Sequence, residues 1–146
     1  MKKISCGILA WRKKGNDIQF FLVHPGGSSW ANKDLGCWGM PRGERIEGES
    51  AVETALREFK EETGADVCGE LSYLGRVKQN KYKDVNCFSV ELDLGDDFIL
   101  RSNEITVNGE TFPEVDKGIY FCYAVAKKKI SPAQLVFLDE IMRRHS

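Results

Sequence analysis

GERIEGESAVETALREFKEETGA, which runs from Gly43 to Ala65, ends in an unusual concentration of negative charge. Its final part, REFKEETG, places Glu58, Glu61 and Glu62 within about one helical turn. Like charges three and four residues apart on a helix repel, at a cost of a few tenths of a kcal/mol per pair. Such a cluster therefore requires a compensating interaction elsewhere in the folded protein.

The residues around these glutamates predict a helix. Ser50 and Glu53 fit a capping box, and Gly64 fits a C-terminal stop, so we expect the helix over residues 51–63. At about 100° per residue, Glu58 and Glu62 fall together at one edge of the apolar face. The apolar face itself should contain Ala51, Val52, Ala55, Leu56 and Phe59.

Two carboxylates one turn apart, a third nearby and a glycine-rich segment upstream are typical of a site for a hard cation. Mg²⁺ takes oxygen ligands and often bridges a few carboxylates to substrate phosphates. The alternative is an ordinary solvated acidic face, which is common on helix surfaces.

Apolar runs on both sides of this helix predict strands over residues 4–11, 18–25, 70–79, 86–94 and 118–125, the last running into a short helix. Residues 26–49 are expected to form a long ordered loop, and residues 95–113 a polar, irregular segment. A second helix is predicted over residues 131–145. Ser131 would be its cap, Pro132 would lie in its first turn, and Gln134 would complete a capping box.

The composition favours one domain spanning residues 1–146, without an internal repeat or linker. The formal net charge of −1, with Lys and Arg spread along the chain, argues against general nucleic-acid binding or binding to anionic membranes. Five widely spaced cysteines favour reduced thiols. Since we find no signal-like or membrane-spanning run, we expect a soluble, cytoplasmic protein, whether monomer or homodimer.

The whole stretch resembles the Nudix hydrolase motif, G-x5-E-x7-R-E-U-x-E-E-x-G-U, where U is a bulky apolar residue. The matching residues are Gly43, Glu49, Arg57, Glu58, Phe59, Glu61, Glu62 and Gly64. Ala65 departs from the pattern at its last apolar position. The segments LVHPGGSSWANKDLGCWGMPRGE, FPEVDKGIYF and KISPAQLVFLDEI are similar to a bacterial branch of small nucleoside-triphosphate pyrophosphohydrolases, whereas residues 81–109 match least and have no assigned role.

The resemblance implies an α+β fold, the Nudix α/β/α sandwich with a mixed sheet between helices. It also implies that Glu58 and Glu62 bind Mg²⁺, or Mn²⁺ in its place, and that Glu61 assists through water or a second cation. Arg57 would hold the glutamates in place, and Glu49 would join the metal shell or orient another carboxylate.

The resemblance also implies roles for backbone groups and for a general base that would activate the attacking water. Gly43 and Gly48 would permit turns, and the carbonyl of Arg42 would complete the coordination of the metal. Glu114 is the first candidate for the base and Glu61 the second. The alternative for Glu114 is a solvated loop charge.

Several residues are candidates for substrate contact, each with a structural alternative. His24 would contact phosphate or ribose, or anchor a loop. Arg42 and Lys78 would meet phosphates, unless they are simply solvated. Four aromatic residues would stack a nucleobase or belong to the core: Trp30, Trp38, Tyr82 and Phe112.

The predicted function is Mg²⁺-dependent hydrolysis of a nucleoside diphosphate linked to another group, foremost (deoxy)nucleoside triphosphates. Hydrolysis of dinucleoside polyphosphates is the alternative within the same chemistry. A catalytically silent, nucleotide-binding regulatory module is the alternative of another class, and loss of a metal-binding glutamate would have favoured it. A basic stripe, which would indicate an RNA or cap pyrophosphohydrolase, is missing from the sequence.

Overall fold

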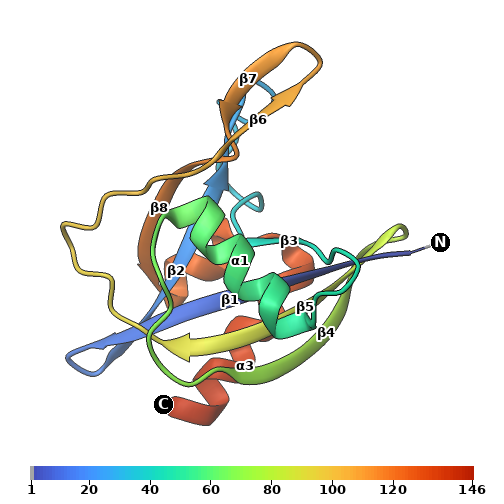
Figure 1. Ribbon diagram of the computed structural model, residues 1–146. Helices are drawn as coiled ribbons and strands as arrows, with labels where there is room; N and C mark the ends of the chain where they lie inside the picture. The colour runs from blue at the N-terminus through green and yellow to red at the C-terminus, as the bar shows by residue number, and fades with distance from the viewer. Residues whose placement is uncertain (1) are drawn as a thin grey trace.

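The computed structural model describes residues 2–146 and is built around a mixed β-sheet (Figure 1). The sheet has the strand order β4-β5-β1-β2-β8, and β3 pairs with β1 beside this path. Only the β1–β5 pair is parallel among the paired strands of this sheet in residues 2–146. The strands of the sheet are β1 (Lys3–Lys14), β2 (Asp17–Pro25), β3 (Arg42–Glu44), β4 (Ser72–Asn80), β5 (Lys83–Glu91) and β8 (Val115–Cys122).

Helices cover both faces of this sheet, which confirms the predicted α/β/α arrangement. Helix α1 (Ala51–Thr63) lies on one face; α2 (Tyr123–Lys129), the 3₁₀ turn η1 (Pro132–Gln134) and α3 (Leu135–His145) lie on the other (Figure 1). In β1, Ile8 packs with the α1 core and Leu9 with the α3 core, because successive side chains of a strand point to opposite faces. A strand buried on both faces reads as a continuous apolar run.

Helix α1 has the predicted bounds. The Ser50 side chain accepts a hydrogen bond from the Glu53 backbone N–H, and Gly64 ends the helix in the left-handed region with φ 82°. The predicted core face was wrong at Val52 and Leu56, which remain 39 % and 38 % exposed. The buried face is instead rotated toward the polar side, where it contains Thr54, Ala55, Glu58, Phe59, Glu62 and Thr63.

The two central strands diverge and make room for a segment expected to be loop. The far end of β1 pairs with β2, with Trp11 opposite Phe20, whereas its beginning pairs with β3, with Gly7 opposite Arg42. The backbone around Gly39 bridges to β2. The segment leading to α1 is thus held beneath the helix, and the expectation of a long ordered loop over residues 26–49 missed β3.

Residues 95–113 were wrongly expected to be irregular throughout. They contain a hairpin of β6 (Glu104–Val107) and β7 (Glu110–Pro113), which stands away from the main sheet (Figure 1). Asn108 and Gly109, with φ of 51° and 82°, form its turn. Asn-Gly is the usual sequence of a two-residue hairpin turn, so the signal was present but was outweighed by the polarity of the strands.

The C-terminal helix also differs from the prediction. Its first turn is the separate η1, and the Ser131 side chain makes no capping hydrogen bond. The Gln134 side chain is buried and bonds with the Met40 backbone N–H and the Gln79 side chain, so it is not available for a capping box. No helix within residues 2–146 is long and apolar enough to cross a membrane.

Candidate active site

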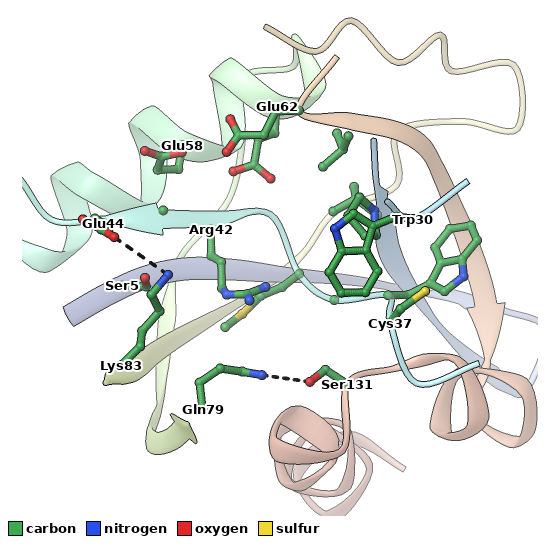
Figure 2. A pocket seen from close by; sticks show the side chains of 18 of the residues that line it. Ser5, Trp30, Cys37, Arg42, Glu44, Glu58, Glu62, Gln79, Lys83 and Ser131 are labelled. Atoms are coloured by element: carbon green, nitrogen blue, oxygen red, sulfur yellow. Dashed lines mark hydrogen bonds and ion pairs between the residues drawn. The ribbon is translucent and has the colours of Figure 1, made fainter. Parts of the chain in front are cut away.

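Three carboxylates converge at the polar edge of α1. Glu58 and Glu62 come from the helix, and Glu114 from the junction between β7 and β8. One oxygen of each lies within 4.8 Å of the others. In Figure 2, Glu58 and Glu62 both point from α1 toward β3. Glu62 is 3 % exposed, and its Oε2 atom has no hydrogen-bond partner in the described part of the chain.

Burial perturbs the ionisation of this cluster. It raises the pKa of Glu62 well above the usual range, and the negative charges of Glu114 and Glu58 raise it further. Burial also raises the pKa of Glu58, despite its contact with Arg57. Oxygen ligands that repel one another and include an unpartnered buried atom fit a divalent hard cation, which would hold Glu58, Glu62 and Glu114 together.

Gly43 allows the Glu58 carboxylate to lie directly against the backbone of β3. A Cβ atom at this position would lie 2.0 Å from Cδ of Glu58 and 2.2 Å from its Oε1, so no larger residue fits without displacing the carboxylate. This close approach accounts for the glycine at the first position of the motif.

Arg57 ties the other glutamates together. Its Nε and Nη2 atoms donate to the two oxygens of Glu49 over 2.7 and 3.0 Å, and Nη1 donates to Glu58 over 2.8 Å and to Glu61 over 3.1 Å. The Arg57 bonds lower the pKa of Glu49 to about 2. Glu49 therefore faces the guanidinium rather than the carboxylate cluster. Gly48, just before it, turns the chain with φ 89°.

Glu114 is held by a residue that the sequence interpretation did not single out. Asn103 donates from Nδ2 to Glu114 Oε1 over 3.1 Å, and its carbonyl accepts the Glu114 backbone N–H over 2.9 Å. The Asn103 backbone N–H donates in turn to the Glu61 carbonyl over 2.8 Å. Asn103 thus links the end of α1 to the loop that carries Glu114, and only tertiary structure brings these residues together.

A cavity of about 500 Å³ opens beside the carboxylates. Arg42 extends into it from β3, and Gln79 and Lys83 reach it from β4 and β5 (Figure 2). Arg42 makes no ion pair within residues 2–146. Burial lowers the pKa of its guanidinium, and the charges of Glu62 and Glu114 partly offset that effect. The cavity is therefore lined both by the carboxylates and by a guanidinium without an ion-pair partner in the described residues.

Trp38 and Trp30 also line this cavity, in different ways. Trp38 is only 3 % exposed and its indole N–H donates to Asp34 over 2.8 Å, so it forms part of the wall. Trp30 is 40 % exposed at the mouth (Figure 2). Phe112 lies in a neighbouring cavity instead.

Three predicted substrate contacts lie outside the lining of this cavity. His24 is buried between Asp116 and the Lys33 carbonyl, at 2.7 Å from each, which is the arrangement of a loop anchor. Lys78 and Tyr82 are exposed on the surface. Gln79 occupies the cavity wall in place of Lys78, because adjacent residues of β4 point in opposite directions. Lys83, the first residue of β5, occupies it in place of Tyr82, which lies in the turn before that strand.

Comparisons with known proteins identify the family and the fold. The family model for the NUDIX domain matches residues 1–141. No curated protein sequence matches the chain. Among solved structures, C. elegans Ap4A hydrolase has a TM-score of 0.68 and 20 % identity, over 97 % of this chain and 96 % of that one.

Two further structures share the fold. The NUDIX domain of Shewanella oneidensis NrtR, in complex with ADP ribose, has a TM-score of 0.69 and 16 % identity, over 100 % of this chain and 90 % of that one. The MutT protein from Methanosarcina mazei Go1 has a TM-score of 0.65 and 18 % identity, over 99 % and 96 %. The match of the family model to nearly the whole chain, on a fold in which the motif glutamates Glu58 and Glu62 converge with Glu114, means that this protein belongs to the Nudix hydrolase superfamily.

Proposed function

We propose that this protein is a Mg²⁺-dependent pyrophosphohydrolase that cleaves a nucleoside diphosphate linked to another group, with (deoxy)nucleoside triphosphates as the first substrates to test. The observation that carries the proposal is the convergence of Glu58, Glu62 and Glu114 within 4.8 Å, with one buried oxygen of Glu62 unpartnered. A bound Mg²⁺, or Mn²⁺, would neutralise phosphate charge and lower the pKa of the attacking water.

Metal binding, positioning of the glutamates and phosphate binding are proposed for different residues of the site. Glu58, Glu62 and Glu114 would hold the cation, and Arg57 keeps Glu58 and Glu61 in position through the bonds described above. Arg42, which has no ion-pair partner within residues 2–146 and lines the same cavity, would bind a phosphate oxygen of the substrate.

Hydrolysis requires a base for the attacking water. The water oxygen bonds to one phosphorus as the bridging P–O bond breaks, and the released proton passes to a carboxylate. Glu114 is our first candidate, since Asn103 holds its Oε1 and leaves Oε2 free of that bond. Glu61 is the second candidate; its side chain is 39 % exposed and shares the Arg57 guanidinium. We treat Glu49 as a partner of Arg57 that stabilises the helix rather than as a metal ligand.

The test is release of phosphate or pyrophosphate from a panel of nucleoside triphosphates, dinucleoside polyphosphates and nucleotide sugars with Mg²⁺. Glu62→Gln should lower turnover by at least about 10²-fold, since it replaces a ligand carboxylate by a neutral amide. Glu70→Gln, the same substitution at an exposed residue outside the cluster, should leave turnover unchanged. Equal activity of Glu62→Gln and wild type would refute the proposed metal site.

Two other candidates rest on the solved relatives. The likeness to C. elegans Ap4A hydrolase supports dinucleoside polyphosphates as alternative substrates. A regulatory module that binds nucleotides without turnover is supported by the likeness to NrtR, of which one structure contains a 27mer DNA. Because of that relative, the absence of nucleic-acid binding stays a prediction from charge. Nucleotide binding without turnover of any compound in the panel would favour the regulatory module.

A further inference from the structure

A second cavity, of about 620 Å³, lies between the β6–β7 hairpin and residues 26–30. It shares three lining residues with the first cavity, namely Pro25, Trp30 and Glu114. Because Glu114 also belongs to the carboxylate cluster, the second cavity borders the proposed cation site through this residue. Both cavities therefore adjoin the proposed reaction centre.

The β6–β7 hairpin packs closely against residues 26–28. A Cβ atom at Gly26 would lie 1.9 Å from the Pro113 carbonyl oxygen, and one at Gly27 would lie 2.8 Å from the Phe112 ring. The Ser28 hydroxyl donates to Glu110 Oε1 over 2.9 Å. These contacts make the second cavity a formed feature of the fold rather than a gap beside a loose arm.

The two cavities differ in charge. The first contains the cationic side chains of Arg42 and Lys83. No Lys or Arg lines the second, whose charged groups are the carboxylates of Glu110 and Glu114. A terminal phosphate in the second cavity would find no cationic side chain among the lining residues, and the carboxylates of Glu110 and Glu114 would repel it.

The remaining walls of the second cavity suit an organic group. Its apolar lining is Pro25, Trp30, Ile105, Val107 and Phe112. Trp30 and Val107 are 40 % and 48 % exposed, so they offer surface that a ligand would cover. Aromatic rings bind bases and sugars by stacking and apolar contact, and this kind of binding depends little on which base or sugar is present.

We infer that this second cavity binds an uncharged organic group on the far phosphate of the substrate, and so selects nucleoside diphosphates with an organic substituent at both ends over nucleoside triphosphates. This inference rests on the proposed function, and it narrows the group that is linked to the nucleoside diphosphate. It also assigns a role to residues 104–109, which belong to the segment 81–109 that resembles relatives least.

The experiment compares compounds that share one nucleoside diphosphate. For adenine these are ATP, ADP-glucose and diadenosine tetraphosphate, with the corresponding sets for the other bases, all with Mg²⁺. We expect kcat/KM for a doubly substituted compound to exceed that for the triphosphate by about tenfold or more.

A variant that fills the second cavity tests its role. Ile105→Trp should lower kcat/KM for the doubly substituted compound by about tenfold and leave that for the triphosphate within about twofold. The matched control is Ile99→Trp, at a residue that is 70 % exposed and lines neither cavity; it should behave as wild type. Preference for the triphosphate, or an equal loss for both compounds in Ile105→Trp, would overturn the inference while leaving the hydrolase proposal in place.

A binding measurement separates this inference from the proposed hydrolysis. If no compound is turned over, calorimetric titration of ADP-glucose and ATP in the presence of Ca²⁺ gives the same comparison without chemistry. Tighter binding of ADP-glucose that Ile105→Trp abolishes would support the second cavity even though the proposed hydrolysis had failed. Equal or tighter binding of ATP would overturn it.

Discussion

Replacing Glu62 by glutamine should make the metal-free protein more stable, although it should destroy the proposed metal site. In the absence of a cation the Glu62 carboxylate is buried beside Glu58 and Glu114, and its Oε2 atom has no partner within residues 2–146. A glutamine side chain removes one of three converging negative charges. Its amide can donate a hydrogen bond to either neighbouring carboxylate.

The size of this gain follows from the unpartnered oxygen. A buried polar atom without a hydrogen bond costs about 1–3 kcal/mol, and more if the group is charged. For a chain of 146 residues, each kcal/mol changes Tm by about 2–4 °C, so Glu62→Gln should melt roughly 2–12 °C above wild type in a chelator. Added Mg²⁺ at about 1,000 times Kd should reverse the order, because a ligand at that concentration stabilises the wild type by about 4.1 kcal/mol.

The same variant has a defined pH dependence. Burial and the neighbouring carboxylates raise the pKa of Glu62 in the folded protein, so its protonated form stabilises the fold. That stability is complete below the unfolded pKa, at about 4.3, and is lost as pH rises through the raised folded pKa. The advantage of the metal-free variant should therefore be small near pH 4 and should grow toward neutral pH.

Thermal unfolding of wild type, Glu62→Gln and the control Glu70→Gln, each with EDTA and with excess Mg²⁺ at several pH values, measures all three effects. Glu70 is exposed and lies outside the carboxylate cluster, so its variant should follow wild type under every condition. A Glu62→Gln protein that is less stable than wild type in EDTA at neutral pH would refute the reasoning, since it would mean that the carboxylate is satisfied without a cation.

Three further substitutions test the parts around the cluster. Gly43→Ala adds a methyl group that displaces the Glu58 carboxylate. It should lower the free energy of unfolding, measured in urea, by about 1–3 kcal/mol and should weaken Mg²⁺ binding. An unchanged Mg²⁺ affinity in calorimetric titration would contradict this. Asn103→Ala frees Glu114 and should lower kcat by about 10–100-fold with little change in KM, as measured by steady-state kinetics. Arg57→Lys keeps the positive charge but cannot donate to Glu49, Glu58 and Glu61 at the same time, so it should lower kcat by about tenfold or more. Kinetics equal to wild type would show that a positive charge at this position is enough to keep the glutamates in place.

Local signals in the sequence predicted the catalytic helix well. Ser50, Glu53 and Gly64 set the bounds of α1 through interactions with residues only a few positions away, and the structure has the same bounds. The buried face was mispredicted because a helical wheel assigns burial to apolar residues. Here Glu58 and Glu62 occupy buried positions, whereas Val52 and Leu56 remain partly exposed.

The rest of the site depends on contacts between distant segments. Glu114 was a candidate only through the family resemblance, and nothing in its local sequence indicates that Asn103 would orient it. Gln79 of β4 reaches the cavity where its strand neighbour Lys78 was expected, and Lys83, the first residue of β5, reaches it where Tyr82 of the preceding turn was expected. Because a one-residue shift moves a strand side chain to the other side of the sheet, correct strand prediction still leaves the lining residues undetermined.

The acidic residues of the motif fall into two electrostatic groups, and that division explains how a short helix tolerates so many of them. Glu49, Glu58 and Glu61 surround the Arg57 guanidinium, which compensates their charge from within the chain. Glu58, Glu62 and Glu114 converge without a cationic side chain within ion-pair distance of Glu62 or Glu114 in residues 2–146. Glu58 belongs to both groups, so Arg57 can hold one of its oxygens while the carboxylate still faces the cluster. Substitutions in the first group should therefore destabilise the fold with or without Mg²⁺, whereas the effect of substitutions at Glu62 should change sign when the cation binds.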